Sequence, residues 1–72
     1  MAAYYITFGQ SHLHYYNGAV LHKDVVALVG NVDTYEQAKK IADHYFGQKY
    51  SRILTEKEMS FEHYPSGIVL IN

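Results

Sequence analysis

One stretch decides the fold of this chain: Tyr4-Tyr5-Ile6-Thr7-Phe8-Gly9-Gln10-Ser11-His12-Leu13-His14-Tyr15-Tyr16-Asn17-Gly18. It begins with β-branched and aromatic residues, which favour strands, and a second run of this kind follows at Val25–Val29. Between the two runs stands Asn17-Gly18, the strongest short-range signal for a two-residue hairpin turn. The stretch therefore predicts a long N-terminal β-hairpin from Tyr4 to Asn31.

Pairing outward from the turn gives the register of this hairpin. We expect these opposite pairs: Tyr16 with Ala19, His14 with Leu21, His12 with Lys23, Phe8 with Ala27, and Ile6 with Val29. A ribbon of thirteen residues a side would reach about 43 Å, whereas the radius of gyration of a compact chain of this length is about 11 Å. The ribbon must therefore bend near Gly9-Gln10 and Asp24, or project as an arm, and in either case it displays the His-Leu-His segment.

The remainder of the chain supplies one helix and two further strands. A helix is predicted from 34 to 46, with Asp33 as N-cap, Glu36 completing a capping box, and Gly47 ending the helix. Its apolar positions recur with helical spacing and form one stripe: Tyr35, Ala38, Ile41, Ala42, Tyr45 and Phe46. Residues 50–55 predict a third strand, and 68–71 a short C-terminal strand.

The predicted fold class is α+β. It consists of an antiparallel sheet of three to four strands in the chain order ββαβ, with the short C-terminal strand as the candidate fourth. A right-handed crossover places the third strand beside the first, so that the first strand lies in the middle. The helix then covers one face, over Ile6, Phe8, Val29, Ala27 and Ile53.

The opposite face of this sheet is predicted to carry Tyr5, Thr7 and Leu28 with no second helix over them. An open face with tyrosine and leucine on it is sticky in water. We therefore expect this face to form a homodimer or to meet another partner.

Size and composition narrow the function classes. The 72 residues make a single domain, 1–72, and the absence of cysteine excludes disulfides and thiolate zinc sites. No signal peptide and no run of membrane-spanning length is present, so we expect a cytoplasmic protein and no membrane partner. Six Lys and Arg against seven Asp and Glu disfavour a nucleic-acid partner, because phosphate binding needs a basic face.

Two histidines are the first candidates for a site. His12 and His14 stand two apart on a strand and so project to one side, as two metal-binding imidazoles would. A third ligand would have to be His63, or Asp24 if the hairpin is bulged. We favour the interpretation that His12 and His14 are surface or hydrogen-bonding histidines, and we predict neither a bound metal nor a cofactor. Ser11 and His12 are poorly placed to act as a nucleophile and its general base, because neighbouring residues on a strand point to opposite faces.

Tyrosine supplies the second candidate surface. The chain has eight tyrosines, a residue type that suits surfaces packed on one side and wet on the other. Tyr15 and Tyr16 flank the hairpin turn, where a cross-strand contact or a protein-binding hot spot is expected. The predicted partner-binding residues are Gln10, His12, His14, Tyr15, Tyr16 and Lys23.

Three segments carry a resemblance to a known group. Tyr5-Ile6-Thr7-Phe8-Gly9-Gln10-Ser11-His12-Leu13-His14, then Asn17-Gly18, then Phe46-Gly47-Gln48-Lys49-Tyr50-Ser51 resemble segments of small accessory proteins from bacteriophages and prophages. The similarity extends to about Ser51. The resemblance implies a phage accessory gene product, of which many bind and block a host protein, including effectors of bacterial immunity. It implies no catalytic residue.

Two functions from different classes follow. The favoured one is a non-enzymatic inhibitor, such as an anti-CRISPR or other anti-defence protein, that occludes a host protein sterically. The alternative is a small-ligand binding protein that holds a metal or a signalling nucleotide at His12 and His14, with Gln10 and His63.

Overall fold

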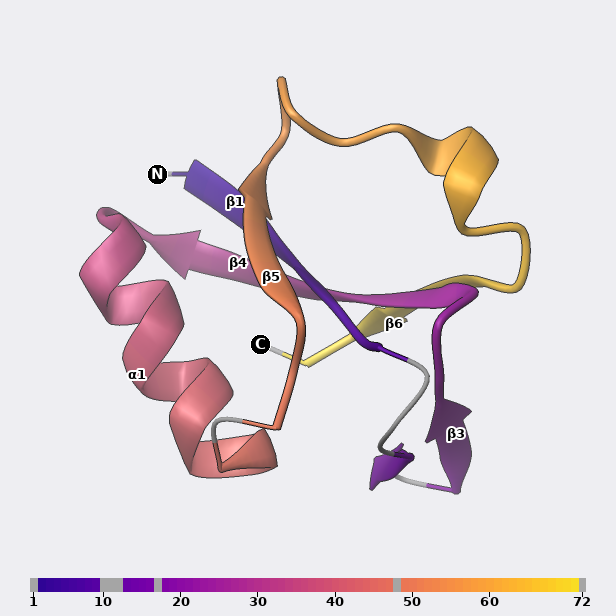
Figure 1. Ribbon diagram of the computed structural model, residues 1–72. Coiled ribbons are helices and arrows are strands. Elements are labelled where there is room, and N and C mark those ends of the chain that lie inside the picture. Colours follow the sequence, from indigo (N-terminus) through magenta and orange to yellow (C-terminus); the bar gives the residue numbers. More distant parts are fainter. Residues whose placement is uncertain (1, 10–12, 17, 48, 72) are drawn as a thin grey trace.

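A four-stranded mixed sheet forms the centre of the protein, and a two-stranded hairpin and one long helix lie against it (Figure 1). The computed structural model describes residues 2–9, 13–16, 18–47 and 49–71. The elements in chain order are β1 (Ala2–Thr7), β2 (His14–Tyr16), β3 (Ala19–Leu21), β4 (Val25–Val32), α1 (Tyr35–Phe46), β5 (Arg52–Thr55), the short 3-10 helix η1 (Phe61–His63) and β6 (Gly67–Leu70). The predicted α+β class is confirmed.

The main sheet has the strand order β5-β1-β4-β6. β1 lies between β5 and β4 and pairs antiparallel with both, as a right-handed crossover predicts. β6 is added beyond β4 and runs parallel to it, which makes the sheet mixed. β5 and β6 are therefore the two edges of this sheet.

The register of the predicted ribbon holds only near its turn. β2 and β3 pair Tyr16 with Ala19 and His14 with Leu21, as expected. In the main sheet, however, Ile6 lies opposite Ala27 and not Val29. Residues 8–13 join β1 to β2, whereas only 22–24 join β3 to β4, and these unequal connections displace the outer pairs. The displacement is two residues, an even number, so each side chain keeps its face.

The ribbon bends and does not project as an arm. The bend lies at the predicted position near Asp24, where the Val25 amide donates to the His22 carbonyl over 3.0 Å. Gly9 lies in the other connection, and Gln10 is outside the described residues. Figure 1 shows the hairpin on the same side of the main sheet as α1. The radius of gyration, 11.0 Å, agrees with the value expected for a compact chain.

Helix α1 begins one residue later than predicted and ends as predicted. Its N-cap is Thr34, whose Oγ1 accepts from the Gln37 amide at 3.2 Å, so the prediction of Asp33 was wrong. Gln37 Oε1 in turn accepts from the Asp33 amide at 2.7 Å, which takes over the role assigned to Glu36. Gly47 ends the helix in the left-handed conformation, with φ 62°, which glycine adopts without steric cost.

The core lies between the sheet, α1 and the hairpin. Ala38, Ala42 and Phe46 of α1 are buried against the sheet. The sheet and hairpin residues of this core are Ile6, Phe8, Leu21, Val25, Ala27, Val29, Val32 and Ile71. Three of the six residues of the predicted apolar stripe are therefore buried, and Ile41 is partly buried against the core, whereas Tyr35 and Tyr45 are 49% and 46% exposed.

The opposite face of the sheet was predicted to be open, but it is covered at Tyr5 and Thr7. Tyr5 and Thr7 are only 7% and 3% exposed, and Leu28 is half-buried. Figure 1 shows the connection between β5 and β6, with η1, on this side of the sheet. This connection, which is irregular for most of its length, thus lies on the face that was predicted to need a partner.

Candidate functional site

The two faces of the β2–β3 hairpin have opposite environments. His14 and Tyr16 point toward the core, because alternate residues of a strand face the same side. The His14 ring packs against two phenylalanines that also contact each other, and its centroid lies 5.5 Å from that of Phe8 and 5.2 Å from that of Phe46. Its Nε2 lies 2.8 Å from the Lys49 carbonyl oxygen, which can only accept, so Nε2 donates. His14 is therefore a hydrogen-bonding histidine, the interpretation favoured from the sequence, and its role in binding a partner stays a prediction.

Tyr16 and Leu21 complete the inward side of the hairpin. The Tyr16 hydroxyl donates to the Ile71 carbonyl at 3.3 Å, and its ring meets Tyr45 edge-on at 5.5 Å. Leu21 has no exposed surface and belongs to the main core. The inward side thus holds the hairpin to the end of α1 and to the C-terminal segment.

The outward hairpin face, which we define as Leu13, Tyr15 and Val20, consists of large apolar side chains in water. Their exposed fractions are 59%, 69% and 43%. Tyr15 and Val20 are directly opposite each other in the hairpin, and Leu13 directly precedes β2. Single exposed apolar residues are common, but three exposed on one short hairpin make it a candidate binding surface.

A hollow of about 270 Å³ lies beside this face and is lined by Gly9, Leu13, His22 and Lys23. His22 Nδ1 accepts from the Asp24 amide at 3.2 Å, so this nitrogen is engaged in the turn. Lys23 is exposed and provides a positive charge at the rim. The hollow extends the outward hairpin face with a shallow, mixed apolar and polar surface.

The predicted partner-binding residues are thus divided by the structure. Tyr15 and Lys23 are exposed, whereas His14 and Tyr16 face inward, and Gln10 and His12 lie outside the described residues. Neighbours on a strand cannot share a face, and treating Tyr15 and Tyr16 as one contact overlooked this.

The residues proposed as metal ligands do not form a described site. His63 is exposed in η1, and His14 is engaged as above. Within residues 2–9, 13–16, 18–47 and 49–71, no three histidine, aspartate or glutamate side chains gather as a metal site would require. His12 falls in the gap of that description.

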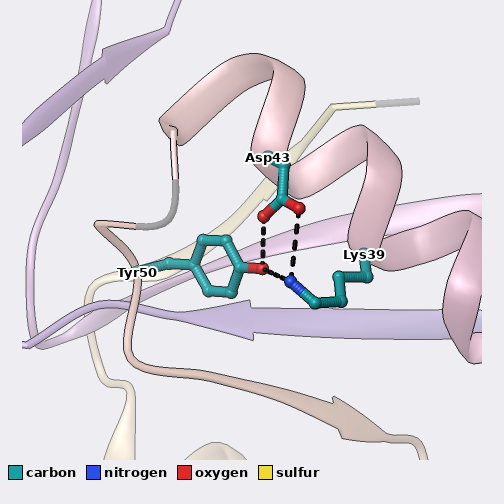
Figure 2. A network of polar contacts seen from close by, with 3 residues as sticks. All are labelled: Lys39, Asp43 and Tyr50. Carbon is teal, nitrogen blue, oxygen red and sulfur yellow. Dashed lines mark hydrogen bonds and ion pairs between the residues drawn. The ribbon is translucent and has the colours of Figure 1, made fainter.

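A polar network on the helix supports the loop that receives His14. The Tyr50 hydroxyl donates to Asp43 Oδ1 at 2.7 Å, and Lys39 Nζ donates to Asp43 Oδ2 at 3.2 Å (Figure 2). The hydrogen bond from Tyr50, and then that from Lys39, lowers the pKa of Asp43. Burial, and then the Asp43 bond, raises the pKa of Tyr50. Both shifts move these groups away from titration near neutral pH, where an acid or base catalyst must titrate.

Sequence reasoning missed Leu13 and Val20. The available signal was the alternation itself: Leu13 and Tyr15 share one side of the first strand, and the register places Val20 opposite Tyr15. The histidines of the same segment drew the prediction instead, and of these the fold turns His14 inward, while His12 lies outside the described residues.

Comparison of the chain with models of protein families, with curated proteins and with solved structures finds no match. Across the part of the chain that the structure describes, no helix has the length and apolar character needed to cross a bilayer. Function must therefore be argued from the surface described above.

Proposed function

We propose that this protein is a non-enzymatic, phage-type accessory protein that binds a host protein through the outward hairpin face and blocks it sterically. Components of bacterial defence, CRISPR effectors among them, are the first class of target to test. The observation that carries the proposal is the exposure of Leu13, Tyr15 and Val20 together on one side of a firmly held hairpin.

The chemistry of this face suits a protein partner. Tyrosine is enriched among the residues that dominate binding energy, because it buries a large ring and still offers a hydroxyl. At 69% exposure, the Tyr15 ring has most of its surface left to bury. Leu13 and Val20 extend the apolar area beside it, and Lys23 stands at the rim, where a charge contributes to steering and specificity.

The inward side of the hairpin contributes by preorganisation. His14 and Tyr16 hold the hairpin through hydrogen bonds to two different segments of the chain, and Leu21 anchors it in the core. A surface that is already ordered loses less conformational entropy when it binds, so more of the contact energy remains as affinity. The net charge of −1 supports a protein and not a nucleic-acid partner.

The small-ligand alternative finds less support in the same geometry. It requires His14 to turn its imidazole to a metal or nucleotide, whereas the ring packs against Phe8 and Phe46 and its Nε2 donates to the Lys49 carbonyl. Freeing it would sacrifice these contacts. Thermal-shift screening against divalent metals and nucleotides separates the two functions, since a ligand at 100 times its dissociation constant adds about 2.7 kcal/mol of stability.

The test compares two exposed tyrosines in a phage-challenge assay. Bacteria with an active CRISPR system express wild type, Tyr15→Ala or Tyr35→Ala, the last altering a tyrosine that is 49% exposed on α1. We expect wild type and Tyr35→Ala to restore phage growth and to co-purify with the same defence protein, and Tyr15→Ala to lose both. Circular dichroism establishes that each variant is folded.

Two results would contradict the proposal. In the first, wild type restores phage growth against none of a panel of defence systems and retains no host protein. In the second, Tyr15→Ala and the double variant Leu13→Ala/Tyr15→Ala behave as wild type, which would place the contact elsewhere on the molecule.

A further inference from the structure

Among the described residues, no strand lies beside one side of the β6 backbone. On its other side β6 pairs with β4, in parallel, with Leu70 beside Leu28. The Ile71 amide donates to the Leu28 carbonyl at 2.9 Å, so the backbone of Ile71 faces β4. Backbone groups alternate in direction along a strand, and Val69 therefore also faces β4. The amide and carbonyl groups of Ile68 and Leu70 point to the open edge.

The side chains of the same two residues are exposed. Ile68 is 48% and Leu70 is 63% exposed, and both project from the face of the sheet that carries Leu28. The segment from Gly67 to Ile71 contains no charged residue. A bare, apolar strand edge of this kind is a template for pairing with another strand.

The other edge of the sheet is protected. β5 begins with the exposed charge of Arg52, and its last amide, that of Thr55, donates to Glu58 Oε1 at 2.9 Å. Charged side chains and occupied backbone groups are the usual means by which proteins block edge pairing. The described residues of β6 have no charged side chain and no hydrogen bond that occupies their outward backbone groups. The β5 edge is therefore protected against strand pairing, and the β6 edge is not.

We propose that β6 pairs antiparallel with β6 of a second copy of this chain, about a two-fold axis that passes beside Val69. In this register Ile68 lies opposite the partner's Leu70, and Leu70 lies opposite the partner's Ile68. Each outward amide then meets an outward carbonyl, which is the closed arrangement of a hydrogen-bonded antiparallel pair. The main sheet continues from one copy into the other.

The occupant is a second copy because the edge is complementary to itself. Its two outward residues are two positions apart, so a rotation about the residue between them exchanges one for the other. The same rotation sets Ile68 against leucine on one face, where cross-strand apolar pairs stabilise a sheet. A register shifted by two residues would place Leu70 opposite Ser66 and lose one of these pairs. With a net charge of −1, two copies repel each other only weakly.

The proposed dimer uses the β6 edge and not the sheet face of Tyr5, Thr7 and Leu28 that was predicted from the sequence. Tyr5 and Thr7 are buried within one chain and cannot form that interface, whereas half-buried Leu28 lies beside Leu70. The outward hairpin face shares no residue with this edge, so the dimer does not depend on the proposed host contact.

A single cysteine tests the register, because the chain has none of its own. In Val69→Cys the two thiols face each other across the axis in a non-hydrogen-bonded pair, with Cα atoms about 4.5 Å apart, within reach of a disulfide. In the matched control, Leu70→Cys, the thiols lie on a diagonal of about 7–8 Å, which a disulfide cannot span without backbone movement. At about 10 μM protein we expect Val69→Cys to oxidise to a covalent dimer on the order of 100-fold faster than Leu70→Cys, since paired sites meet at millimolar effective concentration.

Wild type provides a second readout that needs no substitution in the strand. Hydrogen exchange of the Ile68 and Leu70 amides should slow as protein concentration rises, together with an increase in mass by analytical ultracentrifugation. Ile68→Lys should abolish both effects, and Tyr15→Ala should change neither. A wild type that stays monomeric at all concentrations would overturn the proposal. A dimer in which these two amides stay unprotected, or in which Val69→Cys and Leu70→Cys cross-link equally fast, would overturn it as well.

Discussion

The inward and outward sides of the β2–β3 hairpin differ in exposure and in contacts, although their residues alternate along the strand. Tyr15 is 69% exposed, whereas its neighbour Tyr16 donates a hydrogen bond to the Ile71 carbonyl and packs on Tyr45. Val20 is 43% exposed and its neighbour Leu21 is fully buried. Composition alone would treat each pair as equivalent, and only the pleat of the strand separates anchoring from display.

This difference teaches how a chain of 72 residues can keep an apolar surface in water and still fold. A core of this size is marginal, and every apolar residue left outside is lost to it. The hairpin gives only one side to the core, but it does so with hydrogen bonds to Lys49 and Ile71 at distant points of the chain. The exposed side is thereby held in one conformation.

The largest expected effect sharpens the contrast between Leu21 and Val20. Leu21→Ala leaves a cavity in the fully buried part of the core and should lower the free energy of unfolding by about 2–5 kcal/mol. Val20→Ala, one residue away on the exposed side, should cost about 1 kcal/mol or less. Urea denaturation followed by circular dichroism measures both. Equal losses would mean that the two sides of the hairpin do not differ as described.

A smaller effect is expected at His14, where a hydrogen bond and ring packing are lost together. His14→Ala should lower the free energy of unfolding by about 1–3 kcal/mol, because it removes the bond to Lys49 and the contacts with Phe8 and Phe46. His14→Phe keeps a ring and should recover part of this loss. Tyr15→Ala is the control on the exposed side, with an expected change within about 0.5 kcal/mol. If Tyr15→Ala proved the more destabilising, Tyr15 would be part of the core and not of a binding face.

Periodicity was sufficient to predict most of the fold. The β-branched runs, the helical stripe and Gly47 each depend on local rules, and the elements they predict are present. The N-cap was missed by one residue because Asp33 and Thr34 are both good caps, and only the backbone decides which side chain reaches the Gln37 amide.

Tertiary contacts decided what periodicity could not. The direction in which the hairpin folds follows from the fit of His14 against Phe46, a residue distant in sequence. β6 pairs parallel to β4, and no local pattern in Ile68–Ile71 specifies that partner. The exposed surface lies in the predicted hairpin, but its two sides divide the predicted residues. Tyr15 is exposed together with Leu13 and Val20, which were not predicted, whereas His14 and Tyr16 face inward.

The smallest expected effect concerns the support beneath the inward side, and it appears as a pH dependence. The bonds from Tyr50 and Lys39 hold the pKa of Asp43 below its ordinary value of 3.8. A carboxyl whose pKa is lower in the folded state stabilises the fold above its unfolded pKa and loses that contribution as pH falls through the folded value. The free energy of unfolding should therefore decrease from about pH 4 downward, and Glu58, whose pKa is lowered by its bonds from Thr55, acts in the same direction.

Asp43→Asn should flatten this decrease without abolishing it. Tyr50→Phe should flatten it less, because the bond from Lys39 still lowers the pKa of Asp43, and the double variant should match Asp43→Asn, because residue 43 then no longer titrates. Unfolding curves at a series of pH values test this. A decrease as steep in Asp43→Asn as in wild type would show that the network in Figure 2 does not contribute to holding the loop that receives His14.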